Sequence, residues 1–401
     1  MITGKENLLH IAQLSQSLIP VFEKQGLGNY FKEENLTKIG RFTRLETMLK
    51  SNNIDVDSFV ESLNVLLKEE RKVSKTSMDQ QENLHFAAML PCGLRNPFKE
   101  FTESFIEENE KLDLDFNYLI EGNVNHELSY YPLLDNIKDE SELPDIVMAS
   151  DVNNFFHRPF VERFVDKGVF ETYTPYSPNE YLQKANYADP QNHYTMFTAN
   201  MLIMVVDKEK LGDRKMPEKW EDLLDPCFAN DIIMRGEDDF FCNAVLLPFY
   251  KEWGMPAIKT LATNIKSGKH PAEMVKLAGK GSDEGAAIYI MPYFFSKRIK
   301  SDKVAVVWPE DGAIASPVFL LVKKDKVQKN KVLLDFLLGE TMGEMLQNRY
   351  FPSIHPDLNN DALPTAVSWL GWDFLRQHDI GQLKADIRDE FMKIWTKKEA
   401  L

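Results

Sequence analysis

Apolar side chains near the start of the chain recur at helical spacing. Residues 8–22 carry them on one face, and the run ends at Gly26, which predicts a first helix. Thr43 and Glu46 form a capping-box pattern, in which each side chain satisfies the other residue's free amide, so a second helix is predicted there.

Residues 55–67 repeat the helical spacing with Phe59 and Leu63 on one face, which predicts a third short helix. Helices this short need one another to be stable. We therefore expect a small all-α domain over residues 1–72, followed by a polar linker over residues 73–84.

From residue 85 the pattern changes to short apolar runs that alternate with helical segments. Residues 85–90, 114–119 and 146–149 are predicted strands, and this alternation is typical of a parallel sheet with helices on its faces. Such sheets bind ligands at the carboxyl ends of their strands. The loops that follow the strands at 91–96, 121–125 and 151–154 are therefore candidates, with ligand-binding positions at Cys92, Gly93, Asn153 and Asn154.

Two longer apolar stretches lie further along. Residues 196–206 predict a long strand with a polar interruption at Asn200, another candidate. Residues 303–325 predict two buried strands around a turn that contains Glu310 and Asp311. We expect the stretch to return the chain between two lobes, with its loop facing a cleft.

A second set of strand ends lies between those stretches. Residues 231–234 predict a strand, and Arg235 leads into a helix predicted over 240–250, so a guanidinium and a helix N-terminus could hold an anion together. The acids at 237–239 would either join this site or cap the helix. Residues 286–291 predict another strand, on which Tyr289 and Met291 share one face and are candidates.

Composition excludes several classes of function. The 401 residues carry a net charge of −15, which argues against nucleic acid or an anionic membrane as partner. The start of the chain lacks the apolar core of a signal peptide and no later run is long enough to insert in a membrane, which predicts a cytoplasmic protein, or an extracytoplasmic one if the chain was trimmed.

The three cysteines show no metal-binding spacing. Cys92 has two interpretations, a partly exposed thiol that binds a soft metal or cofactor and a small buried apolar residue, whereas Cys227 and Cys242 are predicted in the core. No HExxH, GxSxG, Walker A or GxGxxG motif is present, so no enzyme activity is predicted, and the sequence leaves open which cofactor or metal the protein binds.

The run MPEKWEDLLDPCFANDIIM at 216–234 resembles a signature of bacterial extracellular solute-binding proteins, in particular the ferric-iron-binding-like branch of the type 2 periplasmic binding proteins. Similarity continues through GAAIYIMPYFF, VVWPEDGAIASPVFLLVKK and FPSIHPDL. The resemblance implies an α/β fold of two lobes joined by crossing hinge strands. Lobe I would span 85–200, lobe II 201–304, and residues 305–401 would return to lobe I and end in helices.

The same resemblance assigns structural roles to several aromatic residues. Trp220 and Leu223 would anchor the core of lobe II, and the helical tail from Ala362, including Phe391 and Trp395, would pack on lobe I. The turn at 309–317 recurs across the family, which favours a structural role for Glu310 and Asp311 at the hinge.

The N-terminal segment TRLETMLKSNNIDVDSFVESLN resembles a small helical domain of unknown function from anaerobic bacteria, which is similar to one at the N-terminus of iron–sulfur cluster repair proteins. The adjacent cysteines frequent in that family are missing here, which argues against a redox or metal role, so a bundle that docks on a protein partner or dimerises is predicted. Iron-binding relatives of the second domain use two neighbouring tyrosines. Tyr130 and Tyr131 fall in the wrong part of lobe I, and Tyr289 and Tyr293 are four residues apart, so direct ferric binding is disfavoured.

Three functions remain open on the sequence. The favoured one is non-enzymatic binding of a metal ion, metal chelate or small anion, with hinge closure, in a cytosolic binding or sensing protein. The second is the substrate-binding subunit of an ABC transporter, which would have a permease as partner. The third is an enzyme that uses the same cleft.

Overall fold

The structure is a computed structural model. It describes residues 5–14, 18–32, 35–40, 43–52, 54–56, 59–60, 63, 84–109, 116–122, 131–134, 136–237 and 240–399. The chain divides into two compact units, Met1–Glu82 and Asn83–Leu401. This division falls inside the predicted linker, and the predicted boundaries at residues 200 and 304 stay predictions.

The first unit is helical, as the apolar spacing predicts. Phe22 is central to its core, with ring centroids 4.2 Å from Phe31 and 5.2 Å from Phe59. Its described elements are α1 (Leu8–Leu14), α2 (Ile19–Lys24), η2 (Gly28–Phe31), η3 (Leu36–Gly40) and α4 (Leu45–Ser51).

The predicted capping box at Thr43 is wrong. The N-cap of α4 is Arg44, and no side chain caps the helix there. The Thr43 carbonyl instead accepts a hydrogen bond from the Leu8 amide, and the Leu45 amide donates to the Glu6 carbonyl. These two bonds hold the chain extended at the position where the box would need to close.

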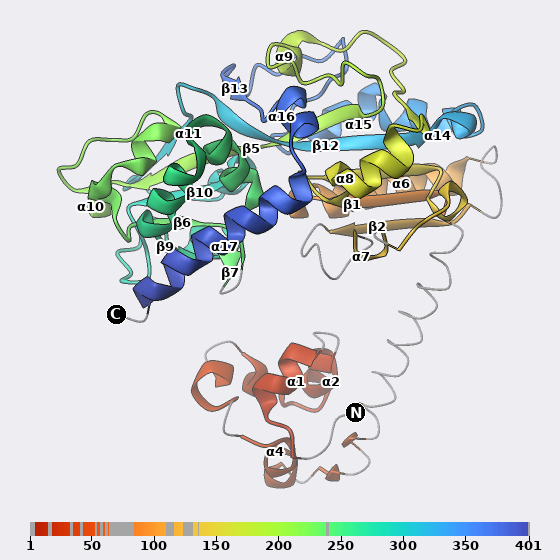
Figure 1. Cartoon of the computed structure of the whole chain (residues 1–401). Helices are drawn as coiled ribbons and strands as arrows, with labels where there is room; N and C mark the ends of the chain where they lie inside the picture. The colour runs from red at the N-terminus through yellow and green to blue at the C-terminus, as the bar shows by residue number, and fades with distance from the viewer. Residues whose placement is uncertain are drawn as a thin grey trace. The chain divides into compact units, whose positions relative to one another are not determined.

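The second unit is built on one large sheet of order β2-β1-β3-β12-β5-β10-β6-β9 (Figure 1). Its first half, lobe I, contains β1 (Phe86–Leu90), which pairs in parallel with β2 (Tyr118–Gly122) and with β3 (Ile146–Ser150). Both β1 and β3 are buried along their whole length, which explains their continuous apolar sequences.

Two long antiparallel strands connect the halves. β5 (Thr195–Asp207) pairs with β12 (Ala313–Lys323), with Ile314 opposite Leu202 and Leu320 opposite Thr195. The pairing of these two stretches confirms the crossing strands. β11 (Val304–Val307) pairs with the far end of β5, but it is not buried as predicted, since Val306 is 46% exposed.

The other half, lobe II, contains three strands. β10 (Ile288–Pro292) runs antiparallel to β5 and parallel to β6 (Ile232–Met234), which in turn pairs in parallel with β9 (Ile265–Gly268). Trp220 and Leu223 are buried as predicted, and the Trp220 indole donates to the Gly312 carbonyl at 2.8 Å.

Helices follow the strands in both halves and place their N-termini at the strand ends. The longer ones, and those that bound the cleft, are α6 (Cys92–Glu108), α11 (Asn243–Asn264), α12 (Pro271–Leu277), α13 (Tyr293–Ser296), α14 (Lys331–Leu337), α15 (Glu340–Gln347), α16 (Trp372–Gln377) and α17 (Ile380–Glu399). The shorter elements are α7 (Tyr131–Leu134), η5 (Glu140–Glu142), η6 (Asn154–Phe156), α8 (Arg158–Phe160), η7 (Val161–Val165), β4 (Phe170–Glu171), α9 (Glu180–Gln183), α10 (Lys208–Leu211), η8 (Trp220–Leu224), η9 (Pro226–Phe228), β7 (Gly236–Glu237), β8 (Phe240–Phe241), η10 (Lys324–Lys326) and β13 (Val367–Ser368).

The last helix, α17, contacts both lobes (Figure 1). On lobe I the Lys384 amine donates to the Val152 carbonyl at 3.1 Å. On lobe II Lys259 pairs with Glu390 at 3.1 Å, and Phe391 packs on Phe241 at 4.6 Å. The prediction that the tail packs on lobe I thus fits Trp372, which packs on Tyr194, but not Phe391, because the apolar face of α17 is long enough to reach lobe II as well.

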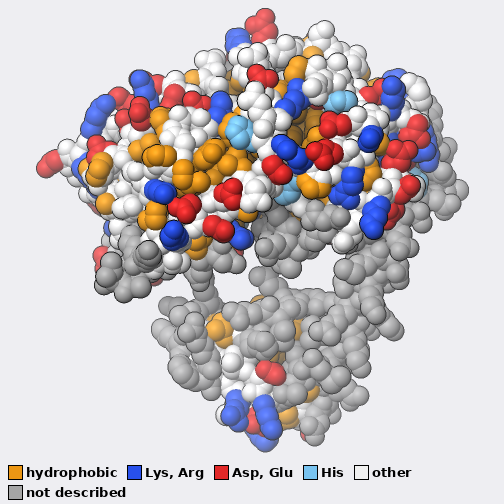
Figure 2. All heavy atoms as spheres, in the orientation of Figure 1, with side chains coloured by type: hydrophobic (Ala, Val, Ile, Leu, Met, Phe, Trp, Pro, Cys, Tyr) orange, Lys and Arg blue, Asp and Glu red, His pale blue; other side chains and the backbone are white. Residues whose placement is uncertain are grey.

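Acidic and basic side chains are intermixed on the face of the second unit shown in Figure 2, so the negative net charge does not gather into one patch there. Among the described residues, no helix combines the length and apolarity needed to cross a membrane.

Candidate functional site

A cavity of about 60 Å³ lies between the lobes, where strand ends from both halves of the sheet meet. Pro91 and Cys92 directly follow β1, and β3 ends at Ser150, with Asp151 after it. The crossing strands supply the back wall, with polar side chains at Asn200 and Ser316. This position is the one that the ligand rule for parallel strands predicts.

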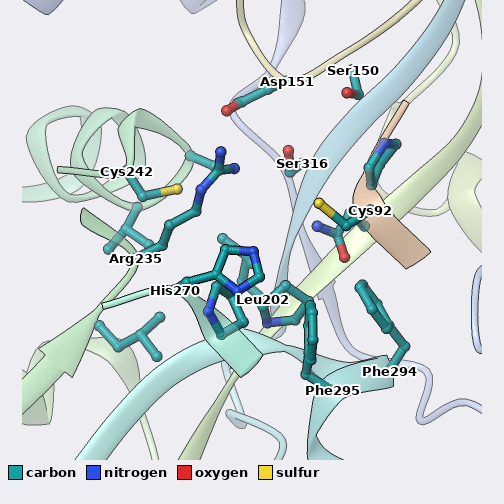
Figure 3. A pocket seen from close by; sticks show the side chains of 17 residues that line it. Cys92, Ser150, Asp151, Leu202, Arg235, Cys242, His270, Phe294, Phe295 and Ser316 are labelled. Atoms are coloured by element: carbon teal, nitrogen blue, oxygen red, sulfur yellow. The ribbon is translucent and has the colours of Figure 1, made fainter. Parts of the chain in front are cut away.

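Lobe II supplies the opposite wall. Arg235 follows β6, Cys242 precedes α11, and His270 precedes α12. Ile290 and Pro292 of β10 lie beneath them, together with the rings of Phe294 and Phe295. Figure 3 shows Arg235 and His270 reaching in from this side, with Asp151 and Ser316 on the other.

The His270 ring presents a hydrogen-bond donor to the cavity. Its Nδ1 accepts from the Ala272 amide at 3.1 Å, so in the neutral ring the proton lies on Nε2. Burial, and secondarily the charge of Arg235, lowers the pKa of His270, which keeps the ring neutral near pH 7. Arg235 and His270 thus give one wall a fixed cation and a neutral donor.

Asn200 has unused hydrogen-bonding capacity. Its Oδ1 is buried and has no protein partner. A buried amide oxygen without a donor is costly, and a ligand that carries an N–H or O–H group would satisfy it.

An aromatic contact holds the lobes together next to the cavity. A Cβ added at Gly93 would lie 2.6 Å from the Phe294 ring, so a larger residue there would displace the ring. Phe294 also packs on Phe351 of lobe I, with ring centroids 5.3 Å apart. Beside it, the Lys297 amine lies over the Tyr293 ring, 4.2 Å from its centroid, which commits this tyrosine to packing.

Residues 141–378 match the family model described as bacterial extracellular solute-binding protein. The chain belongs to this family. No curated protein sequence matches the chain.

Solved structures similar to this solute-binding protein share its fold at low identity. One is the Trichodesmium protein IdiA (FutA), described in complex with iron and citrate, at 14% identity and a TM-score of 0.53; the match covers 78% of this chain and 98% of that one. A ferric binding protein from Campylobacter jejuni has 15% identity, a TM-score of 0.52 and the same coverage. AfuA from Actinobacillus pleuropneumoniae, described with fructose-6-phosphate bound, also has 15% identity, a TM-score of 0.52 and that coverage. They confirm the predicted two-lobed type 2 fold.

Three of the ten residues predicted to bind ligand line the cavity of this solute-binding protein, namely Cys92, Asn200 and Arg235. Cys92 is exposed, which rules out its interpretation as a small buried residue. Gly93 is adjacent, but its position is explained by the contact with Phe294. Whether these residues touch a ligand stays a prediction.

The structure places two predicted asparagines away from the cavity wall. Asn153 is fully buried and caps η6, while its amide donates to the Tyr131 hydroxyl at 3.1 Å and to the Ser150 carbonyl at 3.0 Å. Asn154 belongs to η6 itself. The wall is formed instead by Ser150 and Asp151, because η6 turns the chain inward directly after them.

Tyr289 and Met291 share a face of β10, as predicted, but it is the face away from the cavity. Ile290 and Pro292 alternate with them and line the wall. The Tyr289 hydroxyl accepts from the Ala286 amide at 3.1 Å, and burial raises its pKa to about 12.

Glu310 and Asp311 lie at the hinge turn rather than in the cavity wall. The Asp311 carboxylate accepts from the Trp220 amide at 3.1 Å, and Glu310 forms an exposed ion pair with Lys219 at 3.7 Å. The prediction that this loop faces the cleft is wrong, and the structural role for the turn fits these contacts.

Three further differences concern lobe II. The helix predicted to start at residue 240 begins at Asn243, because β7 and β8 form a hairpin before it, and Glu237 lies in that hairpin. Asp238 and Asp239 lie outside the described residues. Cys227 is exposed rather than in the core, since it lies in the surface turn η9.

Sequence reasoning missed His270, Cys242, Ser150, Asp151 and Ser316. Asp151 lies in a loop that was predicted to carry ligand groups, so the strand-end rule could have found it. His270 stands directly before Pro271, a signal that predicts a helix start there. Within the described ranges, no three His, Cys, Asp or Glu side chains are arranged to hold a metal ion.

Proposed function

We propose that this solute-binding protein captures a small anion in the interlobe cavity, as the substrate-binding component of an ABC transporter. The observation that carries the proposal is the pairing of Arg235 with His270 Nε2–H on one wall. A guanidinium and a neutral N–H donor are complementary to phosphate, sulfate or carboxylate oxygens.

The N-termini of two helices also favour an anion. α6 and α11 begin at Cys92 and Asn243, on opposite sides of the cavity, so the partial positive charges of their N-termini lie near it. Asp151 opposes an anion, but it lies on the other wall, where it would interact with a donor group of the solute.

The cavity size favours a small solute. Its volume of about 60 Å³ is well below the roughly 300–1,000 Å³ of pockets that enclose drug-sized ligands. Two of the similar structures are described with anions, citrate with iron in one and fructose-6-phosphate in the other. A ligand of that size would need the lobes further apart.

Family membership favours the transport role over the cytosolic sensing role that the sequence favoured. Non-covalent capture, with a small-molecule ligand and a permease as partner, follows from that role. Hinge closure around the crossing strands would couple binding to a change of shape that a permease can recognise. The transport role also requires the protein to act outside the cell membrane, which recovery in cell fractions tests. A docking role for the first unit stays a prediction.

The test is calorimetric titration of the full chain with inorganic phosphate, sulfate and citrate. We expect Arg235→Ala to weaken binding of the preferred anion by about 10–100-fold, since a charged hydrogen bond contributes about 1.5–3 kcal/mol. The melting temperature should change little, because the side chain points into the cavity.

Arg388→Ala is the matched control, because Arg388 is an exposed arginine of α17 that does not line the cavity. It should bind with the wild-type dissociation constant. Equal affinity of Arg235→Ala and wild type for every anion that binds would reject the proposal, as would the absence of anion binding.

A further inference from the structure

Two of the three cysteines line the same cavity from opposite lobes. Cys92 begins α6 after β1 of lobe I, and Cys242 caps α11 of lobe II. Both are free thiols, and Figure 3 shows their sulfur atoms on facing walls and directed into the pocket. The third, Cys227, lies in a surface turn and does not line the cavity.

The surroundings of the two sulfurs differ. Cys92 is exposed at the first turn of a 17-residue helix. Burial, and then the charge of Asp151, raises the pKa of Cys242 to about 11, although Arg235 acts in the opposite direction. The Cys242 thiol therefore keeps its proton near pH 7, and loses this proton only when a metal ion binds the sulfur.

The available ligands limit which metal ions could bind. His270 Nδ1 already accepts from the Ala272 amide, so its neutral ring offers the cavity a donor and no lone pair. Because no group of three or more metal-binding side chains exists among the described residues, a tetrahedral zinc site does not fit. Two thiolates suffice for soft monovalent ions such as Cu(I) and Ag(I), which bind two sulfurs in a line.

The charged groups around the cavity act on this unit in opposite directions. Two thiolates and one monovalent cation form a unit with one net negative charge. Arg235 on the lobe II wall supplies one positive charge that favours the unit, whereas the Asp151 carboxylate on the lobe I wall opposes it.

We infer that closure of the lobes places one soft monovalent metal ion between the sulfurs of Cys92 and Cys242. Each thiol releases one proton to solvent as its sulfur–metal bond forms, and no electron is transferred. The inference goes beyond the proposed anion, and because both ligands would occupy the same cavity, they should exclude each other.

The test uses Ag(I) as a probe that does not change its oxidation state, added to the reduced full chain in chloride-free buffer without added thiols. Native mass spectrometry gives the stoichiometry, and competition calorimetry gives the affinity. We expect one tightly held ion per chain, and a loss of about 100-fold or more in Cys92→Ser and in Cys242→Ser, because one thiol cannot chelate. Binding should strengthen as the pH rises, since two protons are released.

Cys227→Ser is the matched control and should bind like the wild type. Thermal unfolding of each variant, together with Cys92→Ala and Cys242→Ala, separates loss of the site from loss of the fold. Wild-type affinity in any folded Cys92 or Cys242 variant would overturn the inference, as would equal weak binding at all three thiols.

The anion proposal can fail independently. Calorimetric titration of the wild-type chain with each anion in metal-free buffer tests it apart from the metal site. Retained Ag(I) binding without anion binding would overturn only the anion proposal, and the reverse result would overturn only the metal site.

Discussion

Lobe I faces the cavity with short polar side chains, whereas lobe II faces it with an arginine, a histidine and two phenylalanine rings. Lobe I positions its groups rigidly, since Asp151 has φ of 69° and its amide donates to the Pro317 carbonyl at 2.7 Å. The longer side chains of lobe II reach across the cavity. We infer that lobe II supplies most of the attraction for a solute, and that lobe I supplies the fit that completes closure.

Replacing Gly93 is expected to change anion affinity the most, because this residue lies at the contact where lobe I fits against Phe294 of lobe II. In Gly93→Val the new side chain would collide with Phe294, whose ring lies 2.6 Å from the position of the added Cβ. Overpacking of this kind costs about 1–3 kcal/mol, so anion affinity should fall by about 10–100-fold. Calorimetry measures this loss, and small-angle scattering should show a larger radius of gyration.

Removing the opposing ring provides the control for that experiment. In the double variant Gly93→Val with Phe294→Ala, affinity should recover part of the loss, because the two side chains no longer compete for space. Unchanged affinity in Gly93→Val alone would show that fit at this contact does not limit closure.

Asp151→Asn tests whether the lobe I carboxylate opposes an anion. Asparagine tolerates the positive φ of this position and keeps an oxygen for the Val152 amide, which donates to Asp151 at 2.8 Å. Removing one negative charge from the wall should raise phosphate affinity by about 5-fold, equivalent to about 1 kcal/mol.

The matched control is Asp166→Asn, an exposed carboxylate of lobe I outside the cavity, which should leave affinity unchanged. If Asp151→Asn instead weakens binding, the carboxylate accepts a hydrogen bond from the solute, and the division of roles between the lobes is wrong.

Protonation of His270 should change anion affinity the least of these predictions, and the change depends on pH. Because burial and Arg235 lower its pKa, the ring is neutral at pH 7.5 and gains a proton only in more acidic solution. An anion favours the protonated ring, so affinity should rise as the pH falls towards 5.5 and decline again as the pH rises. Sulfate is the suitable probe, since its own charge is constant over this range.

We expect the sulfate affinity of the wild type to rise about 2–5-fold between pH 7.5 and 5.5. This change corresponds to less than the free energy of one pKa unit. His270→Asn should show a flat profile between pH 5.5 and 7.5. A profile that is unchanged by this substitution would assign the pH dependence to another group.

The fold was predictable because its signals are local. Continuous apolar runs identified β1, β3 and β12, and the order of the motifs identified the crossing strands. The orientation of side chains at the site was harder to predict from the sequence. On β10 the residues Tyr289 and Met291 attract attention by their chemistry, yet the sheet turns Ile290 to the cavity.

His270 was missed for a different reason. α11 ends at Asn264 and β9 begins at Ile265, so no turn residue separates helix from strand. The strand sequence IKSG is short and half polar, which hides it from a search for apolar alternation. Without β9, nothing in the sequence shows that His270 follows a strand end.

Cys242 was assigned to the core because its neighbours are apolar, and it is indeed buried. Cys92 and Cys242 are 150 residues apart in the sequence. Their sulfur atoms face one cavity only because of the way the two halves of the sheet come together. No local pattern contains that information.

The helix α17 gives the lobes a third connection besides β5 and β12. Its contacts include Val152, next to Asp151, and Phe241, next to Cys242, and these two adjoin the cavity wall. A pure rotation about the two strands would pull one contact apart. Opening with this helix packed on both lobes would therefore require sliding of α17 along one lobe, a shear that would limit how wide the cleft can open.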